Sequence, residues 1–217
     1  MPRANWPRPS STLRSNTKRN MNRRIYLARH GQDEDNAQGV LNGHRDSPLT
    51  NLGVTQAEAL AQNISQQKVE IQKIYASPLQ RAYQTAKIVA DKVGLEKPEI
   101  LKDLIERDFG TMTGKLIKDI ERLCAPDIIK TDKIVYFLSP ERCETFPDLM
   151  ERGERVLASL EGEVSDMLLV THGDVGKMIY AAYYGLDWQE VFTMFHFGTS
   201  DLLLLSKNSQ AEEAHVL

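Results

Sequence analysis

The sequence predicts an α/β fold, a doubly wound three-layer sandwich with a mostly parallel sheet and a small helical cap insertion. Two observations support this prediction. Short, continuous apolar runs of strand length recur along the chain, and they alternate with segments of helical periodicity. Continuous apolar strands are typical of parallel sheets that are covered by helices on both faces.

The first half of the chain opens with a predicted strand over residues 25–28. Thr50 can cap a helix that runs through about Gln67. A second strand over 73–76 precedes a helix from Pro78, because proline is favoured near the first helical position. The apolar positions of the first helix include Leu52, Leu60 and Ile64. The second helix places its apolar residues on one stripe: Leu79, Ala82, Ala86, Val89 and Val93.

The second half begins with a candidate third strand over residues 99–104. The stretch from Gly110 to Pro147 is less regular, and we expect short helices in a cap insertion there. The remaining predictions are a helix over about 146–164, a buried strand over 167–170, a helix ending near Gly185 and a strand over 201–205.

The length of 217 residues predicts one folded domain with an inserted cap. We expect a disordered basic leader over 1–22, a domain over 23–207 with its insertion at about 107–147, and a tail over 208–217. No apolar run approaches the roughly 18 residues that span a bilayer, so no membrane segment is expected. The two cysteines lack metal-ligand spacing, which favours a reducing cytoplasm as the location.

The charge of the chain is unevenly distributed. Residues 1–24 carry seven basic and no acidic side chains, which leaves 20 basic and 30 acidic residues and a net charge of −10 for the remainder. An acidic domain argues against nucleic-acid binding. We interpret the leader as a dispensable tail. A transit peptide, a true start at Met21 and a basic nucleic-acid arm stay open as alternatives.

Two histidines follow apolar strands, and each precedes a glycine. His30 stands in Arg29-His30-Gly31, and His172 in Thr171-His172-Gly173. Since ligands of open α/β sheets bind at the carboxyl ends of strands, both side chains are expected at one site. Histidine-mediated phosphoryl transfer needs a neutral imidazole and positive groups around the phosphate oxygens. Arg29 and Arg81 supply guanidinium groups, which fit phosphate well.

Together these motifs resemble the histidine phosphatase superfamily, which includes the cofactor-dependent phosphoglycerate mutases. The matching blocks occur in family order over roughly residues 25–180. They are Arg29-His30-Gly31 with Asn36, residues 43–57, the Ser77-Pro78…Arg81-Ala82…Gln84-Thr85-Ala86 helix, the acidic segment 104–114, Glu144-Thr145-Phe146, and Thr171-His172-Gly173.

The resemblance implies a role for each matching position. His30 is transiently phosphorylated, and Arg29, Arg81 and His172 complete the phosphate pocket. Asn36 and the backbone near Asn42, Gly43 and Gly173 add hydrogen-bond donors. Glu106 protonates the leaving oxygen and later activates water. The implied activity is metal-independent phosphomonoester hydrolysis, with no cofactor and with a small phosphorylated metabolite as the partner.

Several positions depart from the mutase pattern. Gln32-Asp33 replaces Glu-Ser, Asp35 replaces a tryptophan, Cys143 replaces a glycine, and Asp174 replaces an asparagine. Carboxylates at Asp33 and Asp174 can repel a doubly phosphorylated ligand, so the sequence favours a hydrolase. A phosphoglycerate mutase that uses the same chemistry is the first alternative.

Two other classes are weighed against the hydrolase. A metallohydrolase would use His30, Asp33, His172 and Asp174, but the close histidine pairs typical of such sites are absent from the sequence. A binding protein that lost turnover conflicts with the full set of catalytic residue types.

The substrate is defined less closely than the chemistry. The segment 106–115 resembles members that act on small sugar phosphates, which is analogy alone. Lys115, Lys118 and Arg122 are candidates to meet a second anionic group, although a solvated helix face is the simpler interpretation. Trp188, Phe192 and Phe195 are assigned to core packing rather than to a contact surface. The sequence leaves the oligomeric state open.

Overall fold

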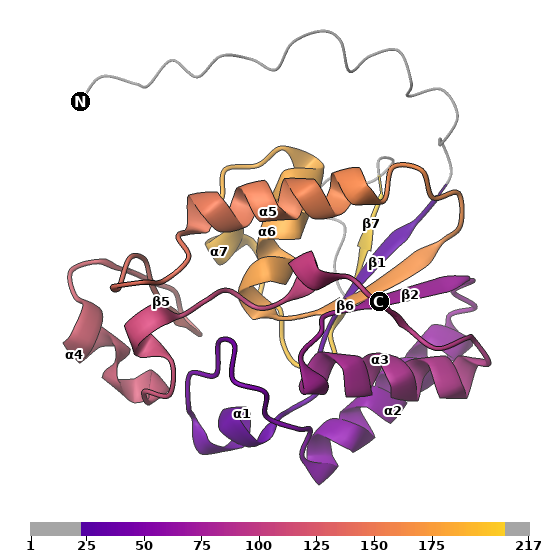
Figure 1. Ribbon diagram of the computed structural model, residues 1–217, viewed down its shortest axis with the longest axis horizontal. Helices are drawn as coiled ribbons and strands as arrows, with labels where there is room; N and C mark the ends of the chain where they lie inside the picture. Colours follow the sequence, from indigo (N-terminus) through magenta and orange to yellow (C-terminus); the bar gives the residue numbers. More distant parts are fainter. Residues whose placement is uncertain (1–22, 207–217) are drawn as a thin grey trace, which may run out of the picture.

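The structure is a computed structural model that describes residues 23–206. The predicted leader over 1–22 and the predicted tail over 208–217 lie outside these residues. A five-stranded sheet in the order β3-β2-β6-β1-β7 forms the centre (Figure 1). Its strands are β1 (Ile25–Arg29), β2 (Lys73–Ala76), β3 (Glu99–Ile100), β6 (Met167–Thr171) and β7 (Leu202–Leu205). Four strands are parallel and β7 is antiparallel, so the predicted mostly parallel sheet is confirmed.

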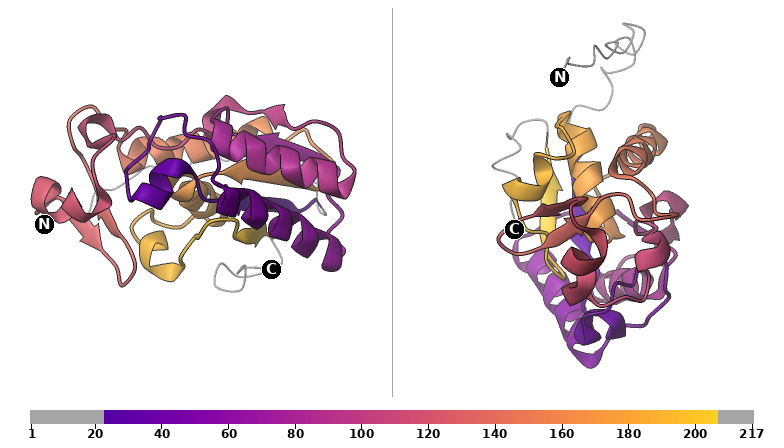
Figure 2. Two further views of the ribbon diagram at one scale, coloured as in Figure 1. Left: turned by 90° about the horizontal axis from the view of Figure 1, so that it is seen from below. Right: turned by 90° about the vertical axis from the view of Figure 1, so that its left-hand side faces the viewer.

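Helices cover both faces of the sheet and complete three layers (Figure 1). One face carries α2 (Asn51–Gln66) and α3 (Gln80–Val93), which lie side by side beneath the sheet (Figure 2). The other carries α5 (Phe146–Ser159) and α6 (Gly173–Tyr184). Successive residues of β1 point to opposite layers, so both kinds of position are apolar and buried.

Helix α2 follows its sequence signals closely at the first turn. The Thr50 hydroxyl accepts a hydrogen bond from the Gly53 N–H at 3.1 Å, as expected of an N-cap. Leu60 and Ile64 are buried, as predicted. Leu52, also an apolar position of this helix, lies in the first turn and is 52% exposed.

Three predicted elements have different bounds in the structure. The strand expected over 99–104 is limited to the two residues of β3, since a 3₁₀ turn over Lys102–Leu104 directs Leu104 into the core. Helix α3 begins at Gln80 rather than at Pro78. Helix α5 ends at Ser159 rather than near 164, because the N–H of Leu160 turns back to the Leu157 carbonyl.

The segment between Arg107 and Pro147 contains the expected short helices and an unexpected hairpin. The 3₁₀ turns Gly110–Met112 and Ile117–Asp119 lead to α4 (Ile120–Cys124). The strands β4 (Ile128–Lys130) and β5 (Val135–Phe137) then pair antiparallel. This segment projects from one end of the molecule, beside α1 (Glu34–Gln38) (Figures 1 and 2). A small apolar cluster holds it together, formed by Leu41, Phe109, Met112, Ile120 and Phe137.

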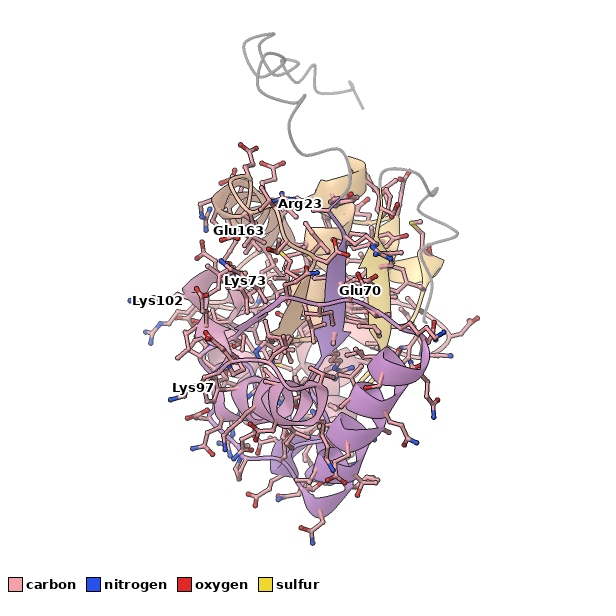
Figure 3. All side chains as sticks on the ribbon, turned by 90° about the vertical axis from the view of Figure 1, so that its right-hand side faces the viewer. Arg23, Glu70, Lys73, Lys97, Lys102 and Glu163 are labelled. Carbon is pink, nitrogen blue, oxygen red and sulfur yellow. The ribbon has the colours of Figure 1, made fainter. Side chains whose placement is uncertain are left out.

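The sheet edge at the amino ends of the strands has a structural charge network. Glu163 accepts hydrogen bonds from Lys73 Nζ and from the Tyr75 hydroxyl, each at 2.9 Å (Figure 3).

Within residues 23–206, no helix combines the length and the apolar character needed to cross a bilayer.

The aromatic residues near the carboxyl end of the chain pack into the core, as predicted. Phe192, in α7 (Val191–Met194), is buried, and the partly buried Trp188 and Phe195 pack against the cluster on the α5–α6 side.

Candidate active site

The two histidines predicted for the site directly follow the neighbouring parallel strands β1 and β6, whose last residues are paired with each other. Arg29 pairs with Thr171 across β1 and β6, and the His30 N–H donates to the Thr171 carbonyl at 3.0 Å. The imidazole centroids of His30 and His172 are 5.0 Å apart, with an interplanar angle of 59°. Both side chains are buried. The sheet register therefore brings together two residues that are far apart in the sequence.

The environment of His30 leaves one ring nitrogen available. Nδ1 lies 2.7 Å from the carbonyl oxygen of Gly31, so Nδ1 carries the proton and Nε2 keeps its lone pair. Burial holds the pKa of His30 well below its usual range, and the positive charges of Arg81 and Arg29 lower it further. A neutral imidazole with a free nitrogen is suited to nucleophilic attack.

Arg81 is the buried hub of the site. It lies in the first turn of α3, after β2, and its Nη1 and Nη2 donate to the carbonyls of Arg45 at 2.7 Å and Gly43 at 2.8 Å. Its Nε lies 3.2 Å from His172 Nδ1 and 3.3 Å from Asp33 Oδ2. Burial lowers the pKa of Arg81, although the guanidinium stays charged in proteins.

The other predicted phosphate ligands lie around this hub. Arg29 Nη1 donates to the Phe197 carbonyl at 2.8 Å, whereas its buried Nε has no hydrogen-bond acceptor within residues 23–206. A side chain at Gly173 would contact the Arg29 guanidinium, so this glycine keeps space open beside it. Gly43 has a φ of +49°, which favours glycine, and its carbonyl is held by Arg81.

Glu106 reaches the site from the loop after β3. Its Oε1 accepts the backbone N–H groups of Arg107 at 2.8 Å and Val175 at 3.3 Å. Its Oε2 accepts the N–H of Gly173 at 3.1 Å. Glu106 is 5% exposed, and its carboxyl group lies at the amino end of α6, where the helix dipole favours negative charge.

The two predicted asparagines differ in their contacts. Asn42 donates from Nδ2 to Asp33 Oδ2 at 2.7 Å, so its side chain supports the site from within. Asn36 lies in α1, and its backbone N–H donates to Asp33 Oδ1 at 2.8 Å. The buried Oδ1 of Asn36 has no hydrogen-bond partner among the described residues.

The structure adds residues that sequence reasoning assigned no role in the site. Ser77 Oγ lies 2.7 Å from His172 Nε2. Arg107 is fully buried between aromatic rings and donates to Asp174 Oδ2 at 3.3 Å and to the Glu144 carbonyl at 2.9 Å. The sequence signal that could have identified Arg107 was its position directly after the predicted acid, Glu106. A buried arginine needs partners, and the neighbouring acidic side chains supply them.

Asp174 lies between Arg107 and Glu106 and has an unusual titration. Burial raises the pKa of the Asp174 carboxyl to about 6, and the negative charge of Glu106 contributes to the rise.

Within residues 23–206, no group of three or more histidine, cysteine or carboxylate side chains has an arrangement that could hold a metal ion.

Comparison with known proteins identifies the superfamily of this chain. The model of the histidine phosphatase superfamily, branch 1, matches residues 25–214. The chain belongs to this superfamily. A protein of Hydrogenobacter thermophilus named "Putative phosphoserine phosphatase 2" is 43% identical over 179 residues, covering 79% of this chain and 84% of that one.

More distant members of the superfamily include mutases and phosphatases. A 2,3-bisphosphoglycerate-dependent phosphoglycerate mutase of Bartonella tribocorum is 26% identical, covering 80% of this chain and 87% of that one. A mycobacterial glucosyl-3-phosphoglycerate phosphatase has a TM-score of 0.72 at 26% identity, covering 85% of this chain and 93% of that one. The chain is therefore an enzyme of the histidine phosphatase kind, as predicted, and its relatives favour hydrolysis over the mutase alternative.

Proposed function

We propose that this phosphatase hydrolyses small phosphomonoesters through a phosphohistidine formed on His30. The observation that carries the proposal is the neutral His30 ring, whose Nε2 has a free lone pair, near the buried Arg81 and the partly buried Arg29. In the first step Nε2 bonds to phosphorus and the ester bond breaks. In the second step water attacks phosphorus, and the N–P bond breaks to restore the ring.

Each remaining site residue has a proposed role in these steps. Arg29, Arg81 and His172 surround the phosphoryl oxygens, and Asn36 and the Gly173 backbone add polar contacts. The unpartnered Nε of Arg29 supports this role, because a buried donor without an acceptor is costly unless a ligand satisfies it. Glu106 gives a proton to the leaving oxygen and then takes one from the attacking water.

We propose phosphoserine or a phosphoglycerate-type acid as the substrate class. The names of related phosphatases support this class. The site also offers Asp174, whose side chain is 16% exposed and lies next to Glu106. A carboxylate at that position can accept the ammonium group of phosphoserine, which phosphoglycerate lacks. Lys115, Lys118 and Arg122 are exposed, and we interpret them as part of a solvated surface rather than as ligands of a second anionic group.

The segment over about 107–147 is proposed to be the cap of the site. The N–H of Leu41 donates to the Lys115 carbonyl at 2.8 Å, which links the segment to the loop after α1. Arg107, at the start of the segment, donates to Glu106, to Asp174 and to the carbonyl of Glu144 near the other end. A cytoplasmic location is proposed as well, supported by the free thiols of Cys124 and Cys143.

The experiment is a phosphate-release assay with phosphoserine and 3-phosphoglycerate in the presence of a chelator. We expect hydrolysis that the chelator does not change, and more rapid release from phosphoserine. A parallel assay supplies 2,3-bisphosphoglycerate and follows the interconversion of 3- and 2-phosphoglycerate. Interconversion that exceeds hydrolysis would select the mutase, and activity that depends on added zinc or manganese would contradict the proposed chemistry.

A further inference from the structure

Behind the proposed nucleophile lies a fully buried carboxylate. Asp33 has no solvent exposure, and its Oδ2 is 3.9 Å from Nδ1 of His30. The same oxygen is 3.3 Å from Arg81 Nε and 2.7 Å from Asn42 Nδ2. Oδ1 accepts the N–H of Asn36 and caps α1. The side chain is thus fixed from several sides.

The position of Asp33 relative to the ring separates it from the phosphate ligands. It faces Nδ1, the nitrogen that donates to the Gly31 carbonyl, whereas the lone pair of Nε2 is on the other side of the ring. An incoming phosphate therefore meets Nε2 and the guanidinium groups first. Asp33 lies behind the ring as a negative charge near Nδ1, at a separation too long for a hydrogen bond.

Transfer of the phosphoryl group changes the charge of this ring. The Nε2 lone pair forms the N–P bond, and the electron pair of the ester bond leaves with the oxygen that takes the Glu106 proton. Nδ1 keeps its proton, so the phosphorylated ring is an imidazolium with a delocalised positive charge. The attack of water returns the N–P electron pair to Nε2 and removes that charge, while a proton of the water passes to Glu106.

We propose that Asp33 is a positioning residue that acts through His30: its carboxylate stabilises the phosphorylated, positively charged ring and thereby sets the lifetime of the phosphoenzyme. The inference rests on the proposed function. A fixed opposite charge within about 4 Å in a buried site favours the charged state. This accounts for a carboxylate inside a pocket built for anions, where it would otherwise oppose phosphate binding.

A purely structural role makes a different prediction. Asp33 neutralises the buried Arg81, and burial of unpaired charge is costly. Burial raises the pKa of Asp33, while the hydrogen bond from Asn36 and the charge of Arg81 lower it. If pairing with Arg81 were its whole role, loss of the charge would weaken phosphate binding or folding but would leave the balance between phosphorylation and dephosphorylation of His30 unchanged.

The test is rapid-quench kinetics with p-nitrophenyl phosphate on Asp33→Asn and Asp33→Ser. Serine is a good N-cap, so the second variant keeps α1 capped if the first does not fold. Nitrophenolate release reports phosphorylation, and acid-labile phosphate on the protein reports the steady-state phosphoenzyme. We expect the burst rate to fall by about tenfold or more, phosphoenzyme breakdown to accelerate, and the steady-state phosphoenzyme fraction to drop several-fold.

The matched control is Asp35→Asn. Asp35 is buried in α1, two residues beyond Asp33, and its carboxylate is held by Arg45 and Ser47. This variant should keep the wild-type phosphoenzyme fraction. The inference is overturned if a folded Asp33 variant keeps that fraction, or if Asp35→Asn lowers it equally. A wild-type protein without burst or phosphoenzyme would instead overturn the proposed function itself.

Discussion

Arg81 Nε lies 3.2 Å from His172 Nδ1, and this contact determines the tautomer of the second histidine. A guanidinium can only donate, so Nδ1 accepts and Nε2 carries the proton that reaches Ser77 Oγ at 2.7 Å. Burial holds the pKa of His172 well below its usual range, with the charge of Arg81 as the next cause. Arg81 therefore organises the second histidine as well as the proposed phosphate pocket.

Arg81→Lys should lower kcat/KM by at least about 100-fold. Lysine keeps the charge but cannot reproduce the fork that holds the Gly43 and Arg45 carbonyls and His172 together. Steady-state kinetics with p-nitrophenyl phosphate measures the loss. Arg155→Lys is the control, because the Arg155 side chain is 57% exposed on α5. A loss of less than about threefold in the Arg81 variant would contradict this role.

Glu106→Gln should separate substrates by the quality of their leaving group. We expect turnover of phosphoserine to fall by about 10²–10⁴-fold, since an alkoxide needs a proton to leave. Release of nitrophenolate, a much better leaving group, should decline far less in the first turnover. Glu96→Gln, at an exposed position between α3 and β3, is the matched control. Equal losses for both leaving groups would argue against a general acid.

The pH profile of kcat/KM should retain activity under mildly acidic conditions. Because the pKa of His30 is held well below 6.5, the ring stays neutral and nucleophilic as the pH falls through that value. A phosphate-release assay across the acidic range measures the limb. Activity that falls on acidification with a midpoint at or above pH 6.5 would contradict the burial argument, provided that variants of Glu106 and Asp174 show the same fall.

Asp174→Asn should become relatively more stable as the pH rises. The folded-state pKa of about 6 exceeds the ordinary 3.8, so the stability linked to protonated Asp174 is present at low pH and is lost between about pH 4 and 6. The free energy of unfolding of the variant, relative to wild type, should gain about 1–3 kcal/mol between pH 4 and 7. Urea unfolding at both pH values measures this, and a pH-independent difference would refute it.

Gly31→Ala should prevent stable folding. A Cβ at Gly31 would lie 2.4 Å from the carbonyl oxygen of Gly53, a backbone atom that cannot rotate away. We expect a loss of at least about 3 kcal/mol in the free energy of unfolding. Gly162→Ala is the control, since no atom of the described residues lies within 4 Å of its added methyl group. A thermal unfolding midpoint equal to that of wild type would contradict the close approach.

The sequence predicted the parts of this protein where the local signals agreed with the fold. The apolar runs of β1, β6 and β7 and the cap at Thr50 were found because pattern and burial coincide there. The strand expected over 99–104 was largely wrong, since packing of Leu104 decides that segment. The five-residue α1 and the β4–β5 hairpin were missed because such short elements lack a full period.

The candidate site was predicted in type but not in detail. The motif order indicated His30, Arg81, Glu106 and His172, and sheet register now brings the two histidines together. Contacts between distant segments were not readable, such as the aromatic rings around Arg107. Asp33 was recognised as a departure from the mutase pattern, but its place behind the His30 ring depends on the fold.

The most direct measurement is the mapping of covalent phosphate after an alkaline quench of the enzyme with p-nitrophenyl phosphate. Mass spectrometry should find an acid-labile phosphoryl group on His30 in the wild-type protein, and none in His30→Ala, which should also lack turnover. Phosphate on a different residue, or normal turnover by His30→Ala, would contradict the assignment of His30 as the nucleophile.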